Sequence, residues 1–326
     1  MLKAAHWTIQ NGSGMHRVAE SLMRGEQEAG LGSVLCDPSK PETWEAGVDA
    51  DVHVCHTHIP DTMRSRATKP WRTIYVGHGT PEHIMQTAID HGLRGSYGHP
   101  DGWMLLQRWL QVADAVVTFW PRHGAILRSL AHRAQRVREV PFGVERSFWC
   151  PGETRGKYAG APSVLTAENQ HHIKWIWDTM VVWPWVTERL PDAHLHALYL
   201  PKDQHRYWFP MANANGAAYK AHISPMALGK DDLRNAFRSV DFLWSPVRYG
   251  DHNRLCCEAA ATGVPVISYT GNVYATHWVP EGDQRVVADA LCAILEGRAE
   301  PRVPQAVPDV SEMVEGMVNV YREVCA

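Results

Sequence analysis

The sequence predicts an α/β protein made of two domains. A length of 326 residues fits two domains of ordinary size, and 45% apolar residues with 14 tryptophans provide for packed cores. Along the chain, short apolar runs alternate with segments in which apolar residues recur at helical spacing. Such alternation is typical of parallel sheets covered by helices.

The first domain is expected to span residues 1–150. Residues 3–9 read as a strand, residues 11–14 as a turn, and residues 15–29 as a helix that Gly30 ends. The other elements expected here are strands at 33–37, 51–57, 73–77, 114–119 and 137–141, and helices at 103–112 and 122–132. Pro151-Gly152 then marks a hinge.

The second domain is expected to span residues 151–305. Its expected elements are strands at 163–167, 193–200, 219–223, 241–244 and 264–269, a tryptophan-rich helix after residue 174, and helices at 231–240 and 286–295. A terminal helix at 311–324, within a last segment of residues 306–326, is expected to pack back on the first domain.

The stretch at residues 245–269 organises the second domain. Asp251 or Asn253 can cap a short helix through Glu258, because a side-chain oxygen satisfies orphan backbone N–H groups there. Gly263 fits the position just after that helix. Glu258 therefore lies on a helix whose N-terminus faces the carboxyl end of a strand, which is where doubly wound sheets bind ligands.

Composition excludes several classes of protein. A net charge of −3 does not suit a nucleic-acid binder. Seven cysteines, with Cys256 next to Cys257, do not form a disulfide framework and favour a reducing, cytoplasmic location. We expect no signal peptide and no transmembrane segment, because the sequence has no apolar run of about 18 residues.

The histidine-rich strands do not predict a metal site. Strand alternation puts His53 on one face and His56 and His58 on the other, so no three ligands converge. His56 or His58 could line a ligand site, or be hydrogen-bonded loop histidines. His194 and His196 read as part of a half-buried strand.

One basic segment is also notable. Arg64, Arg66, Lys69 and Arg72 follow one another with no acidic residue between residues 62 and 76. Such a run is usually a solvated face, but it could contact a phospholipid headgroup, a polyphosphate carrier or a nucleic-acid backbone.

Several motifs together resemble a known family. Ser245-Pro246, Glu258-Ala259, Gly263 and Pro265-Val266 resemble the donor-site signature of retaining glycosyltransferases of the GT-B fold, the family-4 type. The resemblance implies two doubly wound, Rossmann-like parallel-sheet domains that face each other across a cleft, with the acceptor on the first domain and a nucleotide-diphospho-sugar on the second. Gly250 stands where the family has a first glutamate, which contacts the donor sugar.

The resemblance also implies roles for single residues. His78, between two glycines, would act near the donor sugar and acceptor as a general base or hydrogen-bond partner. Lys174 would offset charge on the diphosphate, and Glu258 would bind the ribose hydroxyls. The other donor-binding residues implied are Gly12 and Gly14 (whose loop could also be a simple turn), Asn169, Ile223 near the nucleobase, Gly250, Asp251, Asn253 and Arg254.

The leading hypothesis is therefore a retaining, metal-independent glycosyltransferase with no cofactor beyond a UDP- or GDP-linked donor. A divergent, non-catalytic GT-B protein that binds a nucleotide or glycan is the alternative that Gly250 favours. The basic segment favours a further alternative, a transferase whose acceptor is a macromolecule such as modified DNA or protein. The acceptor is otherwise open: a glycan, lipid or small molecule, with room for a peripheral membrane contact.

Overall fold

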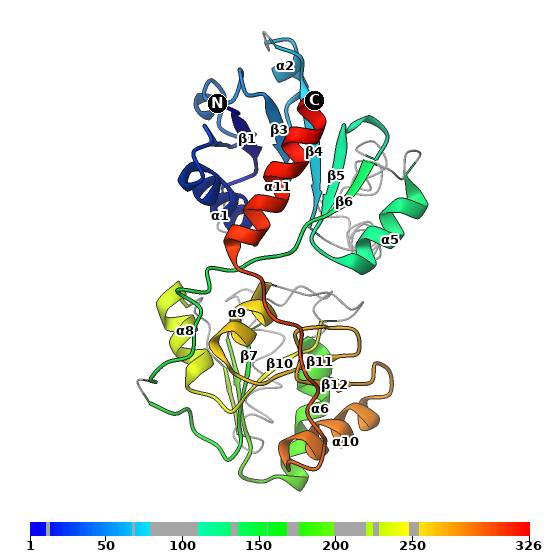
Figure 1. The fold of residues 1–326 in the computed structure, drawn as a ribbon. Helices are drawn as coiled ribbons and strands as arrows, with labels where there is room; N and C mark the ends of the chain where they lie inside the picture. The colour runs from blue at the N-terminus through cyan, green and yellow to red at the C-terminus, as the bar shows by residue number, and fades with distance from the viewer. Residues whose placement is uncertain are drawn as a thin grey trace. The chain divides into compact units, whose positions relative to one another are not determined.

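The computed structural model describes ten segments of the chain: residues 1–10, 14–66, 69–78, 110–131, 136–154, 156–167, 176–198, 220–223, 228–247 and 254–326 (Figure 1). They form two compact units. The first contains residues 1–143 and 308–326, and the second contains residues 144–307. Each unit is described by itself below.

The first unit is built on a parallel sheet. The described residues give it six strands, and every neighbouring pair is parallel. In spatial order they are β2 (Val34–Cys36), β1 (Ala4–Trp7), β3 (Val52–Cys55), β4 (Arg72–Gly77), β5 (Ala115–Thr118) and β6 (Val137–Glu139). Parallel strands place their carboxyl ends at one edge of the sheet, so β1, β3 and β4 bring His6, His56 and His78 to the same edge.

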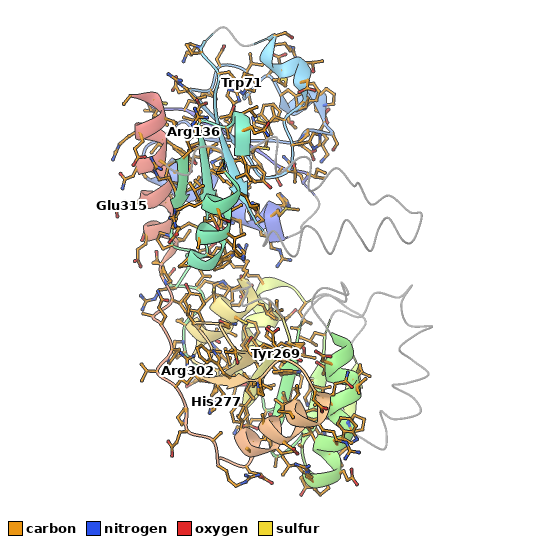
Figure 2. All side chains as sticks on the ribbon, turned by 90° about the vertical axis from the view of Figure 1, so that its right-hand side faces the viewer. Trp71, Arg136, Tyr269, His277, Arg302 and Glu315 are labelled. Carbon is orange, nitrogen blue, oxygen red and sulfur yellow. The ribbon has the colours of Figure 1, made fainter. Side chains whose placement is uncertain are left out.

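Helices surround this sheet. They are α1 (Gly14–Glu28), α2 (Asp61–Arg64), α5 (Pro121–Leu130) and α11 (Val310–Cys325), with a short 3₁₀ turn, η1, at Pro41–Thr43. The helix α11 lies along α1 (Figure 1). A Cβ on Gly25 of α1 would come within 2.6 Å of Val314, so glycine permits this close approach. Glu315 projects outward from α11 (Figure 2).

The second unit repeats the architecture. Its described strands also form a six-stranded parallel sheet. In spatial order they are β12 (His277–Val279), β11 (Val266–Tyr269), β10 (Phe242–Ser245), β7 (Ser163–Thr166), β8 (His194–Ala197) and β9 (Ala221–Ile223). The described helices are α6 (Ile176–Arg189), α8 (Lys230–Arg238), α9 (Arg254–Thr262) and α10 (Gln284–Leu295).

Two buried hydrogen bonds connect α6 to the sheet. The Tyr269 hydroxyl at the end of β11 donates to Asp178 at 2.5 Å, and the Trp244 indole of β10 donates to Thr179 at 2.9 Å. Tyr269 lies within the unit in Figure 2. Around these bonds, apolar side chains of α6 and α10 pack on β10 and β11 as the main core of this unit. Burying tyrosine and tryptophan with their polar atoms paired avoids the penalty of unsatisfied groups.

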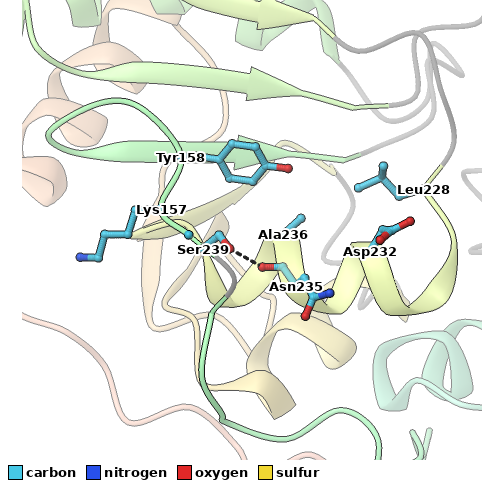
Figure 3. A pocket seen from close by; sticks show the side chains of 8 residues that line it. Lys157, Tyr158, Leu228, Asp232, Asn235, Ala236 and Ser239 are labelled. Carbon is cyan, nitrogen blue, oxygen red and sulfur yellow. Dashed lines mark hydrogen bonds between the residues drawn. The ribbon is translucent and has the colours of Figure 1, made fainter.

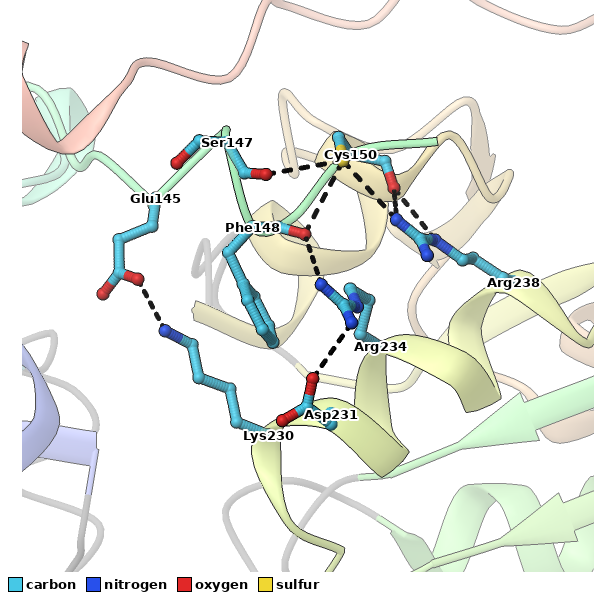
Figure 4. A network of polar contacts seen from close by, with 8 residues as sticks. All are labelled: Glu145, Ser147, Phe148, Cys150, Lys230, Asp231, Arg234 and Arg238. Carbon is cyan, nitrogen blue, oxygen red and sulfur yellow. Dashed lines mark hydrogen bonds and ion pairs between the residues drawn. The ribbon is translucent and has the colours of Figure 1, made fainter. Parts of the chain in front are cut away.

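The segment that opens the second unit is fastened to α8 (Figure 4). Phe148 lies between two cations, with Lys230 Nζ 4.3 Å and Arg234 Cζ 4.1 Å from its ring centroid. Lys230 also pairs with Glu145 at 2.6 Å, and Arg238 Nε donates to the Cys150 carbonyl at 3.0 Å. This cation–π and hydrogen-bond network makes residues 145–150 an ordered part of the second unit.

The expected order of strands and helices is confirmed wherever the structure describes it, with boundaries within a few residues. Gly263 has a φ of +85° after α9, as a helix-terminating glycine should. Three described elements were not predicted, the first of which is the 3₁₀ turn η1. The helix α2 is a single turn, and β12 lies in a stretch to which no element was assigned, because a three-residue strand gives almost no periodic signal.

Candidate functional site

A chain of three histidines runs through the first unit to its carboxyl edge. His78 directly follows β4 and is partly exposed. Its Nε2 lies 2.7 Å from Nδ1 of His56, and Nε2 of His56 lies 3.0 Å from Nδ1 of His6. His6 and His56 are both buried. The structure thus confirms that His56 is a hydrogen-bonded histidine, and it connects that residue to the predicted site residue His78.

The row of three histidines ends at a buried carboxylate, that of Glu26. Glu26 of α1 is fully buried and sits 2.8 Å from His6 Nε2. The Ser33 hydroxyl donates to the same carboxylate oxygen at 2.6 Å, and the Tyr321 hydroxyl of α11 donates to the other at 2.6 Å. Burial alone raises the pKa of Glu26, but the charge of His6 and the three donated hydrogen bonds outweigh it and lower the pKa overall. Glu26 is therefore an anion.

An anionic Glu26 can only accept hydrogen bonds, so Nε2 of His6 carries a proton. When each imidazole carries one proton, Nδ1 of His6 offers its lone pair to His56 Nε2–H. By the same reasoning His56 accepts at Nδ1 from His78 Nε2–H. Nδ1 of His78 is then an acceptor.

Burial disfavours protonation of His56 and His78. It lowers the pKa of His78 from 6.5 to about 4, and lowers that of His56 well below its usual value, with the charges of His78 and His6 adding to the effect. In the described part of the chain, His78 contacts His56 and the Phe119 ring, whose centroid is 6.0 Å away. A base with a pKa of about 4 is weak, so the geometry favours hydrogen bonding over full proton abstraction.

These pKa shifts predict an acid-sensitive first unit. Between pH 6.5 and pH 4 the unfolded chain binds protons that folded His78 and His56 do not, so stability should fall as the pH drops through this range. Urea unfolding at a series of pH values measures the slope. The His78→Gln variant should show a shallower slope, and an unchanged slope would contradict the assignment.

The basic segment is largely neutralised. Lys69 pairs with Asp51 at 3.0 Å, Arg72 with Asp114 at 3.7 Å, and Arg66 with Glu45 at close range. Each of these acids comes from a different part of the first unit. These ion pairs give no support to the predicted phosphate-binding surface, because a cation paired with an acid contributes little net electrostatic field.

In the second unit the structure brings together two predicted donor-binding residues. Glu258 lies on α9 with its side chain 4% exposed, and Arg254, one turn earlier, places Nε 2.5 Å from its Oε1. Gly263 and β11 follow α9 directly. A buried carboxylate held as an ion pair is strongly oriented. It is suited to accepting hydrogen bonds from vicinal hydroxyls if the guanidinium moves aside or shares it.

Three hydroxyl side chains lie at the carboxyl edge of the second sheet, and only one of them, Ser245, belongs to the donor-site signature. Thr166 ends β7, Ser245 ends β10 and Ser268 lies one residue before the end of β11. All three are buried. Within the described residues, the Thr166 and Ser268 hydroxyls have no hydrogen-bond partner. Buried unpaired hydroxyls are costly, so they mark an edge where a polar ligand would be favoured.

Other predicted site residues are only partly visible or lie outside the described segments. Gly14 begins α1, after the end of β1, and nothing described lies within 4 Å of where its Cβ would be. Ile223 ends β9 at the carboxyl edge of the second sheet. The predicted residues outside the description are Gly12, Asn169, Lys174, Gly250, Asp251 and Asn253.

A pocket of about 350 Å³ lies elsewhere in the second unit (Figure 3). Tyr158 and the α8 residues Asp232, Asn235 and Ala236 are among its lining. Burial, with the nearby Asp232 charge, raises the pKa of Tyr158. None of the predicted site residues lines this pocket, so it forms no part of the proposed donor site.

Two parallel-sheet units with candidate residues at their carboxyl edges define the chain as a protein of the GT-B fold. No protein-family model matches the sequence, and a search of curated proteins gives no match. The fold matches solved glycosyltransferases over nearly the whole chain. A sucrose-phosphate synthase from Thermosynechococcus elongatus gives a TM-score of 0.72 at 14% identity, covering 100% of this chain and 96% of that one.

Two further structures extend the comparison. The Anabaena protein HepE, solved in complex with UDP-glucose, gives a TM-score of 0.67 at 10% identity and covers 99% of this chain and 98% of its own. The lipopolysaccharide outer core galactosyltransferase WaaB gives 0.62 at 11% identity, with 99% of both chains covered. The predicted fold class and the predicted resemblance to GT-B glycosyltransferases are confirmed. In addition, no helix of the described residues is long and apolar enough to cross a membrane.

Proposed function

We propose that the protein is a glycosyltransferase that moves a sugar from a UDP-sugar to an acceptor hydroxyl with retention of anomeric configuration. The observation that carries the proposal is the full-length match to glycosyltransferase structures, three of which, all of the Anabaena protein HepE, hold UDP-glucose or UDP. The buried Glu258 beside Arg254 supports it, because it lies where the motif resemblance puts the ribose contact. The sequence resemblance to family-4 enzymes supports retention.

The donor lies on the second unit in this proposal. Glu258 accepts hydrogen bonds from the ribose hydroxyls, Ile223 lies near the base, and Lys174 offsets the charge that develops on the diphosphate as the glycosidic bond breaks. The family resemblance assigns phosphate contacts to Gly12 and Gly14, since a backbone without Cβ atoms allows a ligand to approach closely. No metal ion takes part in this scheme, in agreement with the family resemblance.

The acceptor hydroxyl lies beside His78 of the first unit. When each imidazole carries one proton, Nδ1 of His78 accepts a hydrogen bond from that hydroxyl and fixes the orientation of its oxygen. The bond between the sugar carbon and the phosphate oxygen breaks, the new glycosidic bond forms on the same face of the sugar, and UDP leaves with the proton of the acceptor hydroxyl on its phosphate oxygen. None of the seven cysteines forms a disulfide, which supports a reducing, cytoplasmic setting for this reaction.

A thermal-shift and binding screen tests the proposal. We expect UDP-sugars to raise the melting temperature by several degrees more than GDP-, ADP- or dTDP-sugars, with or without EDTA. Lys174→Ala and Glu258→Ala should abolish the shift. Product analysis by NMR after acceptor screening should show the donor's own anomeric configuration. No shift with any nucleotide sugar, or an inverted product, would contradict the proposal.

A non-catalytic nucleotide- or glycan-binding role is the second candidate. Gly250, in place of the family's first glutamate, is the observation that favours it. In that case UDP-sugars would bind without turnover on any acceptor, and the hydrolysis of the donor would also be absent. A macromolecular acceptor has less support, since the basic segment is paired with acids.

A further inference from the structure

Three histidines gather on one face of the second sheet, outside the proposed donor site. His194 and His196 are two residues apart on β8, so their side chains lie on the same face of the sheet. His222 of β9 is paired directly with His196. One ring nitrogen from each can be chosen so that all three lie within 4.8 Å of one another. The third histidine comes 28 positions after the first, which is why the reading of β8 alone predicted no metal site.

Neighbouring groups orient the imidazoles. His196 Nε2 lies 2.8 Å from the Ala159 carbonyl, so this nitrogen donates its proton and Nδ1 keeps its lone pair. A backbone carbonyl on the opposite nitrogen is the usual outer-shell partner of a metal-binding histidine. His194 Nδ1 lies 2.9 Å from His222 Nε2. A cation bound by both rings would replace this hydrogen bond between two imidazole nitrogens.

The surrounding backbone is shaped to bring the histidines close. Gly160 has a φ of +116°, and a Cβ there would lie 2.6 Å from the His194 Cβ. Only glycine allows the loop before β7 to lie this close to the start of β8. Tyr158, in the same loop (Figure 3), places its ring centroid 4.6 Å from that of His196. Asp192 and Lys220, which pair at 3.5 Å, are charged neighbours before β8 and β9.

The strand that supplies the third histidine needs added support. β9 is a three-residue edge strand bonded only to β8 within the described sheet. Lys220, directly before it, adopts a φ of +49°, an unfavourable conformation for a residue with a Cβ. A bond that joined β8 and β9 through side chains would hold this strand in place.

We propose that His194, His196 and His222 bind a divalent transition-metal ion, with Zn²⁺ as its occupant. Three imidazoles are a known zinc ligand set that leaves a fourth position for water. Zn–N bonds of about 2.0–2.1 Å require the ring nitrogens to move together through side-chain rotation, while the paired strands stay fixed. The ion links the edge strand β9 to β8. It takes no part in sugar transfer and does not depend on the donor site.

Binding of Zn²⁺ to the chelator-stripped full chain tests this proposal. Calorimetry with ZnCl₂ should detect one tight site per chain, and Co²⁺ should give the strong visible bands of a tetrahedral complex. His222→Ala should weaken the affinity by more than about 100-fold, because loss of even an outer-shell partner costs 10- to 100-fold. His222 is exposed, so this substitution should not prevent folding.

A matched variant separates this site from other histidines of the chain. His277→Ala removes a half-buried histidine from β12, the opposite edge strand of the same sheet, and should leave the tight site unchanged. Hydrogen exchange of β9 should slow on Zn²⁺ addition in the wild type and not in His222→Ala. Equal Zn²⁺ affinity in the wild type and His222→Ala, or no tight site at all, would overturn the proposal.

Discussion

Replacing Glu26 with alanine should destabilise the first unit by about 3 to 5 kcal/mol, the cost expected when one member of a buried charged network is removed. The change leaves His6 Nε2, the Ser33 hydroxyl and the Tyr321 hydroxyl buried without their acceptor. Urea unfolding followed by the fluorescence of tryptophans in each unit measures the loss.

Two variants calibrate this result. Glu20→Ala, on the same helix, removes an exposed carboxylate 3.9 Å from Arg24 and should cost less than about 0.5 kcal/mol. Tyr321→Phe removes one of the three donors and leaves Glu26 with two, so it should cost about 1 to 2 kcal/mol. If Glu26→Ala were no more damaging than Glu20→Ala, the anionic network would not exist as described.

Replacing Glu258 with alanine should lower the affinity for UDP by about 100-fold or more. Two hydroxyl hydrogen bonds to a charged carboxylate contribute roughly 1.5 to 3 kcal/mol each, and about 2.7 kcal/mol corresponds to 100-fold in the dissociation constant. The loss should fall on both UDP and UDP-sugars, because the ribose is common to them. Isothermal titration calorimetry with UDP gives the measurement.

The design needs controls for folding and for charge. Glu258→Gln keeps the side-chain volume and should also weaken binding, whereas Glu296→Ala removes a more exposed carboxylate that pairs with Arg298 and should not. Circular dichroism confirms that each variant is folded. A folded Glu258→Ala protein that binds UDP as tightly as the wild type would exclude a ribose contact.

Local sequence patterns predicted most of the secondary structure but few of the contacts in the candidate site. Apolar periodicity predicts strands such as Val52–Cys55 and helices such as Val310–Cys325, because it depends only on residues that are near neighbours in the sequence. Glu258 could be singled out in the same way, because its helix and the following Gly263 are contiguous.

The histidine chain shows what periodicity cannot reveal. His6, Glu26, His56 and His78 come from separate elements, and nothing in their spacing says that they touch. The contacts follow from the strand order of the first sheet, which puts β1 next to β3 and β3 next to β4. A glutamate within α1 reads as a surface residue until α11 covers it. The same holds for His222, whose partners lie on another strand.

The bond between Tyr321 and Glu26 spans 295 positions of the chain and has a consequence for biosynthesis. On the ribosome, the second unit consists of one continuous segment, residues 144–307, and all of it is made before α11. The first unit must wait with α1 uncovered and the Glu26 carboxylate lacking one of its donors until α11 emerges. The half of the protein that is translated first is therefore the half that finishes folding last.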